Sequence, residues 1–356
     1  MADNKKPLGD ELDTKEFICG KVAGGQSQHL SQSVADQFGI SRQSAQKHIK
    51  QLIKEGVLEK SGQTKGVSYK LAIIAEEEKI YQLIPGITED LPWRDFVRPL
   101  LGDLPSNIIS ICQYGFTEMF NNAIEHSNGN TVLVSVQLTA YNVKMWVSDD
   151  GIGIFRKIAK DFNLDDERHA IFELAKGKLT SDPARHSGEG IFFTSRMFDR
   201  FGILSDKLIF THTSHDWLFE EEKPINKGTS VVMEINTSST RTTKSIFEEY
   251  ATIDHPGFYK TIIPLKLAKY GDENMVSRSQ AKRVLTRVEK FTEVVLDFKD
   301  VNEIGQGFAD EIFRVFAQEH PNVHLMSVNT NESVDWMIKR AKATGDSGQP
   351  SLFEDV

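Results

Sequence analysis

Residues 147–155 read VSDDGIGIF and follow the apolar run YNVKMWV at 141–147. The run has the composition of a buried strand, and it ends abruptly in Asp149 and Asp150 before two glycines. Asp and Gly are common where strands turn, so this stretch alone predicts a strand followed by a turn. What the two acids do depends on the segments before and after them.

A long amphipathic helix is predicted upstream, where residues 111–127 read ICQYGFTEMFNNAIEHS. Its apolar residues follow helical spacing, so Glu118, Asn122 and His126 lie one turn apart along one polar edge. Taken alone, this edge is equally compatible with a stripe of polar residues that only faces solvent. Further along come a strand at 131–138, the stretch 141–155, SGEGI at 187–191 and KGTSVVMEI at 227–235.

This order of motifs resembles the GHKL-type ATP-binding domain shared by gyrase, heat-shock chaperones, mismatch-repair ATPases, histidine kinases and anti-sigma-factor serine kinases. The ExxxN motif with its following His looks like Glu118, Asn122 and His126, DxGxG looks like Asp149, Gly151 and Gly153, the third motif looks like Gly188, Gly190 and Ile191, and GT looks like Gly228 and Thr229. The resemblance implies an α/β sandwich, the Bergerat fold, that binds ATP and Mg²⁺.

The resemblance also implies a role for each motif. Asp149 would accept a hydrogen bond from the adenine amino group, and an ionised acceptor strengthens that bond. Gly151 and Gly153 would let the backbone pass close to the nucleotide. Asn122 would be a ligand of Mg²⁺, which takes few protein ligands beside phosphate oxygens. Glu118 would orient and deprotonate the water or hydroxyl that attacks the γ-phosphate.

The segment between the second and third motifs, residues 154–187, is expected to hold a mobile lid. It contains a polar helix-forming stretch at 165–178, and SGEGI after it opens a helix whose first N–H groups would cradle phosphate. Four of its basic residues are candidates for phosphate contact, with solvated loop residues as the alternative: Lys176, Lys178, Arg185 and His186.

Near the N-terminus, residues 30–60 contain two helical patterns separated by Gly39, with Ser41 as the predicted cap of the second helix. This is a helix-turn-helix arrangement, in which the second helix enters the major groove and reads base edges. Its outward residues, the candidate DNA contacts, are Arg42, Gln43, Ser44, Gln46, Lys47 and Lys50.

Two short strands at 57–60 and 67–71 then flank a turn with Gly and Lys, which predicts a wing where Lys60 and Lys65 meet phosphates. Residues 41–70 hold seven Lys or Arg against two acidic residues, although the whole chain has a net charge of −9. Residues 1–75 are therefore predicted to be a winged-helix DNA-binding domain. A protein-docking module is the alternative, because helix-turn-helix folds also serve that purpose.

Residues 76–104 are predicted to be a linker and helical entry, since prolines interrupt them repeatedly. A sensor histidine kinase would carry its phosphoacceptor His on a helical hairpin there, and residues 76–110 contain no His. The downstream segment is also too short for the second catalytic domain of gyrase-like ATPases. The ATP-binding domain, at 105–245, is thus more similar to the anti-sigma-factor serine kinases.

The C-terminal third, residues 258–340, alternates strand and helix and predicts a small α/β domain. VVLDFKDVNEIGQGFADEIF at 294–313 resembles the anti-sigma-antagonist-like (STAS-like, DUF4325-type) domain. In that family a Ser or Thr at the start of the next helix is phosphorylated, but here Gly305, Gln306 and Gly307 stand in its place. The domain therefore either keeps only a docking surface or is purely structural. Residues 341–356 are expected to form a flexible tail.

Length and composition agree with this reading. The 356 residues suggest two or three domains, and 39% hydrophobic with 26% charged residues is typical of a globular chain. No apolar run approaches a membrane span and no signal sequence is evident, so a cytoplasmic location is expected. Cys19 and Cys112 are far apart, which favours neither a disulfide framework nor a zinc site.

The expected fold is therefore multidomain, α/β and α+β: a winged helix, a Bergerat ATP-binding sandwich and a STAS-like domain. The expected function is a bacterial-type regulator that couples ATP binding, with weak hydrolysis, to DNA binding. A protein partner of the sigma or anti-sigma type and a homodimer are further expectations. The alternatives are a serine/threonine kinase acting on a separate antagonist protein, and a protein in which ATP is a structural ligand.

Overall fold

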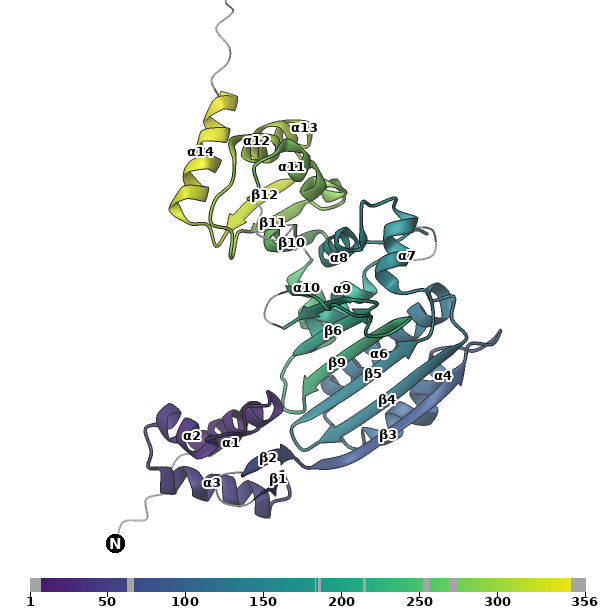
Figure 1. Cartoon of the computed structure of the whole chain (residues 1–356), viewed down its shortest axis with the longest axis vertical. Coiled ribbons are helices and arrows are strands. Elements are labelled where there is room, and N and C mark those ends of the chain that lie inside the picture. Colours follow the sequence, from purple (N-terminus) through teal and green to yellow (C-terminus); the bar gives the residue numbers. More distant parts are fainter. Residues whose placement is uncertain are drawn as a thin grey trace, which may run out of the picture.

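The computed structural model describes residues 8–62, 67–182, 184, 187–213, 216–251, 257–268 and 274–346. The chain forms an N-terminal head, a central antiparallel sheet with helices, and a C-terminal α/β domain, in sequence order from one end of the molecule to the other (Figure 1). Within the described residues, no helix has both the length and the apolar character that a membrane span requires.

The head consists of three helices and a two-stranded antiparallel sheet: α1 (Leu8–Ala23), α2 (Leu30–Phe38), α3 (Arg42–Lys54), β1 (Leu58–Ser61) and β2 (Ser68–Leu71). Gly39 ends α2 with a φ of +61°, which a glycine adopts without strain. The side chain of Ser41 accepts a hydrogen bond from the backbone of Ser44 at 3.1 Å, so the predicted cap of α3 is confirmed.

The first helix of the head was not predicted from the sequence. Ile18, Cys19 and Val22 of α1 are buried in the head's own hydrophobic core. The tip of a hairpin from the central sheet, Ala140 and Tyr141, packs against the same core. The head is therefore joined to the central sheet by packing as well as by the chain.

The central sheet has seven antiparallel strands in the order β3-β4-β5-β9-β6-β7-β8. They are β3 (Ile73–Gln82), β4 (Thr131–Thr139), β5 (Asn142–Asp149), β6 (Arg200–Ser205), β7 (Leu208–His212), β8 (Asp216–Glu220) and β9 (Thr229–Asn236). Alternate residues of β4, including Val132, Val134 and Val136, are buried because successive side chains point to opposite faces. Helices α6 (Ser106–His126) and α9 (Gly190–Met197) cover that buried face.

The prediction of a linker beginning at residue 76 is wrong. β3 pairs with β4 along its length and forms one edge of the sheet. Short helical turns follow it, as expected for the helical entry: α4 (Asp90–Pro92), η2 (Trp93–Val97) and α5 (Arg98–Leu100). Pro92 lies in the first turn of α4, where a backbone N–H has no partner within the helix. Pro99 follows directly on the π-helical turn η2. Trp93 is buried, with its ring 6.0 Å from that of Phe116 on α6.

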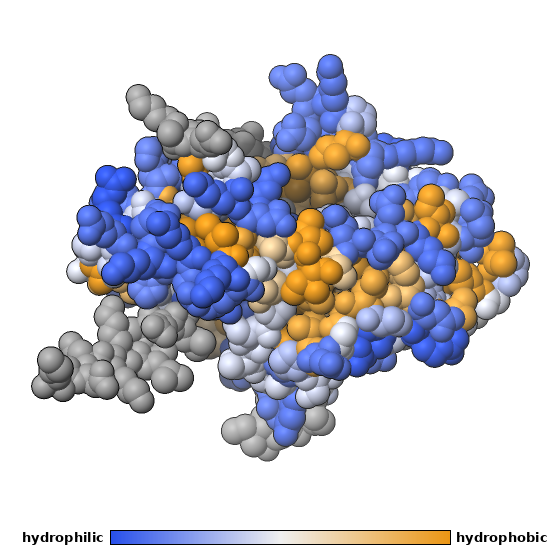
Figure 2. Space-filling view, turned by 90° about the horizontal axis from the view of Figure 1, so that it is seen from below, coloured by the Kyte–Doolittle hydropathy of each residue, from blue (hydrophilic) through white to orange (hydrophobic). Residues whose placement is uncertain are grey.

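The edge strand β3 also leaves apolar side chains at the surface, since Ile73, Ile74 and Ile80 are each more than half exposed. Figure 2, which views the molecule from the head end, shows a mainly hydrophilic surface with hydrophobic side chains gathered near its centre.

Two helices lie between the second and third motifs, α7 (Ile154–Asp161) and α8 (Glu167–Lys176), and α10 (Thr243–Glu249) follows the sheet. The sequence predicted only the second of these, over 165–178. The lid region is therefore largely helical between residues 154 and 176.

The C-terminal domain alternates strand and helix as expected. Its three strands are parallel and lie in chain order, and its helical elements follow each strand: β10 (Lys260–Pro264), η3 (Leu265–Ala268), α11 (Arg278–Leu285), η4 (Val288–Lys290), β11 (Glu293–Asp297), α12 (Gln306–Asp310), η5 (Glu311–Phe316), α13 (Ala317–Glu319), β12 (His324–Val328) and α14 (Glu332–Asp346). The prediction of a flexible tail beginning at residue 341 is wrong for residues 341–346, because α14 continues to Asp346 and Ala341 is buried.

Close packing explains the glycines at positions 305 and 307. A Cβ atom on Gly305 would lie 2.6 Å from Cα of Val276, and one on Gly307 would lie 3.3 Å from the Val276 carbonyl oxygen. The backbone before α11 therefore occupies the space that a Ser or Thr side chain would need at position 305. One continuous hydrophobic core runs from the central domain into this domain.

Candidate functional site

A cavity of about 330 Å³ lies among α6, α7, the ends of β5 and β9, and the start of α9. Its size falls within the range of small-molecule sites in proteins. Of the motif residues, Gly151 and Gly228 do not line it, and the following do: Glu118, Asn122, His126, Asp149, Gly153, Gly188, Gly190, Ile191 and Thr229. Four motifs that are distant in the chain therefore meet around one cavity.

Asp149 ends β5 at the wall of this cavity. Its Oδ1 accepts hydrogen bonds from the backbone N–H of Gly151 at 2.9 Å and of Thr229 at 3.2 Å. Burial raises the pKa of Asp149, while these two backbone hydrogen bonds act in the opposite direction. The carboxyl group is therefore held in one orientation by neighbouring strands.

Asp150 has a structural role that differs from that of Asp149. Oδ1 of Asp150 accepts hydrogen bonds from the backbone of Asn130 at 2.7 Å and of Thr131 at 3.0 Å, and these bonds lower the pKa of Asp150. A Cβ on Gly151 would lie 2.1 Å from the carbonyl oxygen of Ser127, so Gly151 packs on the end of α6 instead of facing the cavity. Asp150 and Gly151 thus build the turn that presents Asp149.

The next glycine starts α7. Gly153 has a φ of +87°, and a Cβ there would lie 2.6 Å from Oγ of Ser205. Oγ1 of Thr229 accepts a hydrogen bond from the backbone of Ile154 at 2.9 Å. Thr229 therefore holds both the Asp149 carboxyl and the first turn of α7.

The polar edge of α6 faces the cavity as the helical spacing predicted. Glu118 lies opposite the start of α9, because a Cβ on Gly190 would be only 2.0 Å from Oε2 of Glu118. Only a glycine leaves room for that carboxylate at the N-terminal turn of α9. His126, at the other end of the edge, lies 3.9 Å from Glu125 and has a side chain that is 40% exposed.

The third motif closes the far side of the cavity. The carbonyl oxygen of Gly188 accepts a hydrogen bond from the backbone of Leu179 at 3.1 Å. Gly188 has a φ of +72° and lies so close to the Leu179 backbone that a Cβ would be 2.6 Å away. Leu179, Thr180 and Ser181 all line the cavity, so this segment forms part of its wall.

Two expected phosphate contacts lie elsewhere. Lys176 is buried and donates hydrogen bonds to Glu173 at 2.6 Å and to the Thr286 carbonyl at 3.0 Å, and Lys178 donates to the Lys290 carbonyl at 3.0 Å. Both lysines therefore bind the C-terminal domain, and their expected role at the phosphates is not supported. Arg185 and His186 lie outside the described residues.

One lining helix was missed in the sequence. Ile154, Lys157, Ile158 and Asp161 of α7 line the cavity, and Lys157 pairs with Asp161 at 3.0 Å. Their spacing is that of one helix face, so the pattern directly after the DxGxG motif could have revealed them. Among the described lysines, Lys157 lines the cavity, whereas Lys176 and Lys178 do not.

In the head, the two faces of α3 are as predicted. Ala45, Ile49 and Leu52 are buried, while the residues expected to contact DNA lie on the other side. Arg42, Gln43, Lys47, Lys50 and Lys60 are exposed, and Ser44 and Gln46 are partly exposed. Lys65 lies outside the described residues.

Comparison with known families agrees with the architecture of the central and C-terminal parts. Residues 91–208 match the histidine kinase-like ATPase domain, so the chain contains an ATPase domain of the GHKL type. Residues 280–335 match the STAS-like domain of unknown function (DUF4325), which identifies the C-terminal domain. The resemblances to a GHKL-type ATPase domain and to a STAS-like domain are thereby confirmed, whereas the closer similarity to the anti-sigma-factor serine kinases stays a prediction. A search among curated proteins gives no match to this chain.

Proposed function

We propose that this chain is a regulator in which the central domain binds and slowly hydrolyses ATP and the head binds DNA. The main support for ATP binding is the position of the Asp149 carboxyl. Gly151 and Thr229 fix it at the wall of a cavity that the other ATPase motifs line. A charged acceptor so placed suits the amino group of adenine.

The residues present also fit the phosphate end of the ligand and a magnesium ion. Backbone at Gly188 and Gly190 approaches the cavity without side chains, as a phosphate-binding segment at a helix start requires. The Asn122 side chain offers an oxygen ligand for Mg²⁺, which when bound would neutralise phosphate charge. Glu118 would orient the attacking water and accept its proton, because its carboxylate lies between α6 and the start of α9.

The DNA-binding part of the proposal rests on the head. A capped helix, α3, presents exposed basic and amide side chains opposite its buried face, and the β1–β2 pair follows it. This is the arrangement that a winged helix uses in the major groove and on the neighbouring phosphates.

Coupling between the two functions would travel along β5 and β9. These paired strands carry Asp149 and Thr229 at the cavity and extend toward the head at their other ends. There, the side chain of Glu16 on α1 accepts hydrogen bonds from Asn236 and, at 3.3 Å, from Ser238. Coupling further requires that ATP bind two arrangements of the protein with different affinity.

The test is fluorescence anisotropy of labelled DNA with the wild type and with Asp149→Asn, each with and without Mg-ATP. We expect Mg-ATP to change the DNA affinity of the wild type by about 5-fold or more and to leave that of the variant unchanged. An equal DNA affinity of the wild type in both conditions would contradict coupling, and no binding to any duplex would contradict the DNA-binding role.

The same cavity would also serve a serine/threonine kinase acting on a separate protein, because Glu118 could accept a proton from a hydroxyl as well as from water. Incubation with γ-labelled ATP and cell extract separates the two functions. A kinase transfers the label to a protein, whereas an ATP-dependent switch releases it only as phosphate.

A further inference from the structure

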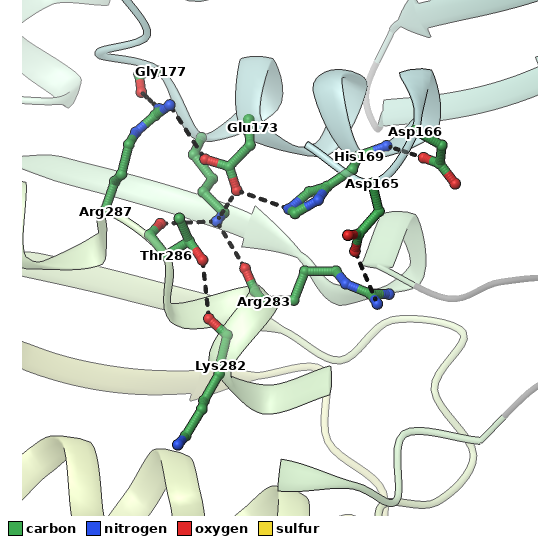
Figure 3. A network of polar contacts seen from close by, with 10 residues as sticks. Asp165, Asp166, His169, Glu173, Gly177, Lys282, Arg283, Thr286 and Arg287 are labelled. Carbon is green, nitrogen blue, oxygen red and sulfur yellow. Dashed lines mark hydrogen bonds and ion pairs between the residues drawn. The ribbon is translucent and has the colours of Figure 1, made fainter. Parts of the chain in front are cut away.

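The end of α8 carries a buried cluster of charged side chains that faces the C-terminal domain. Glu173 and Lys176 have side chains 0% and 1% exposed, and Lys176 Nζ lies 2.6 Å from Glu173 Oε1. Arg287 reaches the same carboxylate from the C-terminal domain at 3.4 Å, and His169 approaches it at 3.6 Å from one turn earlier. Figure 3 shows Arg287 and His169 converging on Glu173 from different elements.

The ammonium group of Lys176 is satisfied by both domains. Besides Glu173, it donates to the carbonyl oxygens of Thr286 at 3.0 Å and Arg283 at 3.4 Å, at the end of α11. An ammonium group has three donors, and these three acceptors match them. The backbone oxygen of Lys176 accepts a further bond from Thr261 on β10 at 2.7 Å. The contact is therefore a specific joint between α8 and the C-terminal domain.

The next two residues are held by the same domain. A Cβ on Gly177 would lie 2.6 Å from the ring of Phe258, and Arg287 donates to the Gly177 carbonyl at 3.5 Å. Lys178 Nζ donates to the Lys290 carbonyl and lies 4.8 Å from the ring centroid of Phe291. An ammonium at this distance from an aromatic face is attracted to it.

The same segment forms the nucleotide cavity on its other side. Leu174 and Leu179, which flank the held residues, both line the cavity, and Leu179 is bonded to Gly188 of the third motif. Phe192 lines the cavity too, and its ring lies 4.5 Å from that of Phe258. One stretch of chain is thus a cavity wall on one side and a docking surface for the C-terminal domain on the other.

We propose that the STAS-like domain is a clamp on the nucleotide site: through Lys176 and Lys178 it positions the wall segment 174–180 and thereby sets the affinity for Mg-ATP. The inference rests on the proposed ATP binding. Lys176 and Lys178 are positioning residues in this view, since they belong to the wall segment but their side chains bind the C-terminal domain and do not line the cavity. By linkage, bound nucleotide must strengthen the docking of the STAS-like domain by the same factor.

Lys178→Ala is the first variant, because Lys178 is only half-buried and its loss leaves the Glu173 pair intact. We expect calorimetric titration to show Mg-ATP binding about 10-fold weaker than in the wild type, and Lys178→Arg to restore it to within about 3-fold. The matched control is Lys282→Ala on α11, whose side chain is 70% exposed and pairs with Glu311 within the C-terminal domain. Its Mg-ATP affinity should equal that of the wild type.

A second arm uses hydrogen exchange of the wild-type chain, so that it does not depend on the folding of any variant. We expect Mg-ATP to slow amide exchange in residues 283–291, which contact the wall segment and not the cavity. The double variant Glu173→Gln with Lys176→Met removes both charges together and should lose this protection.

The outcomes separate the clamp from the function on which it rests. Absence of Mg-ATP binding by the wild type overturns the proposed function and the clamp with it. Equal affinities of the wild type and folded Lys178→Ala, or unchanged exchange of residues 283–291, overturn the clamp alone. A lower melting temperature of Lys178→Ala with unchanged affinity would show a merely structural role and count against the clamp.

Discussion

The carboxyl of Asp149 and the backbone N–H of Thr229, 80 residues apart in the chain, are joined by a 3.2 Å hydrogen bond at adjoining ends of β5 and β9. The Thr229 side chain also accepts a hydrogen bond from the first residue of α7. The predicted adenine contact is therefore linked to α7, the first helix of the lid region. Any ligand that rearranges the Asp149 carboxyl would therefore act on both strands and on α7.

Replacement of Asp149 by Asn should abolish tight nucleotide binding. Asn keeps the Oδ1 acceptor for Gly151 and Thr229 but loses the charge and presents an amide donor to the adenine amino group. We expect calorimetric affinity for Mg-ATP to fall at least about 100-fold. Asp150→Asn is the matched control, since Asp150 bonds Asn130 and Thr131 and does not line the cavity. Equal losses in the two variants would argue against a specific role for Asp149.

Gly190→Ala should separate turnover from binding. The added Cβ would meet the end of the Glu118 side chain, which can move, so the fold should persist while the carboxylate is displaced. We expect single-turnover ATP hydrolysis at saturating Mg-ATP to slow about 100-fold, and Mg-ATP affinity, to which the Gly190 backbone also contributes, to fall much less. Gly202→Ala on β6 is the control, because its nearest neighbour would be 3.8 Å away. Unchanged turnover in Gly190→Ala would remove Glu118 from the proposed role of base.

Asp216 should make the central domain sensitive to acid. Burial opposes its charge, but Arg196 at 3.2 Å and His212 at 2.6 Å outweigh burial and lower the pKa of Asp216 from 3.8 to about 2. Between these two values the unfolded state binds more protons, so stability falls as the pH drops through this window, by about 2 kcal/mol in total.

The measurement is urea unfolding of the wild type and Asp216→Asn at several pH values. At neutral pH we expect the variant to be less stable by about 3 kcal/mol, because Arg196 is left buried without its carboxylate. The gap between the two proteins should narrow as the pH falls below about 4. A constant gap down to about pH 2 would mean that the Asp216 pKa is not lowered in the folded protein.

Lys47→Ala on α3 should weaken DNA binding uniformly across sequences. If Lys47 neutralises one phosphate, the slope of log K against log salt concentration should decrease in magnitude by about 1. Lys244→Ala on α10 is the control, since its side chain is 83% exposed and lies outside the head. Anisotropy titrations at several salt concentrations provide the slopes. Identical slopes for wild type and Lys47→Ala would place DNA on another surface.

Much of the site could be predicted because its signals are local or lie in short motifs. Helical spacing placed Glu118, Asn122 and His126 on one edge of α6, and all three line the cavity. Gly39 and Ser41 marked the turn and cap of α3 through backbone preferences that need no tertiary information. The sequence did not predict β3 because most of its residues are exposed and three consecutive ones are acidic, as in a linker. Only its pairing with β4 shows that it is a strand of the sheet.

The amino-acid sequence by itself determined the class of the central and C-terminal domains, since turn residues, helix periodicity and motif order act over short distances along the chain. Only the tertiary structure decided which lysines face the cavity. Lys176 and Lys178 look like lid residues in sequence, yet their partners are carbonyl groups 110 and 112 residues further along the chain. A charged side chain binds whatever oxygen atoms the fold brings near it, and that proximity is set by the packing of whole domains against one another.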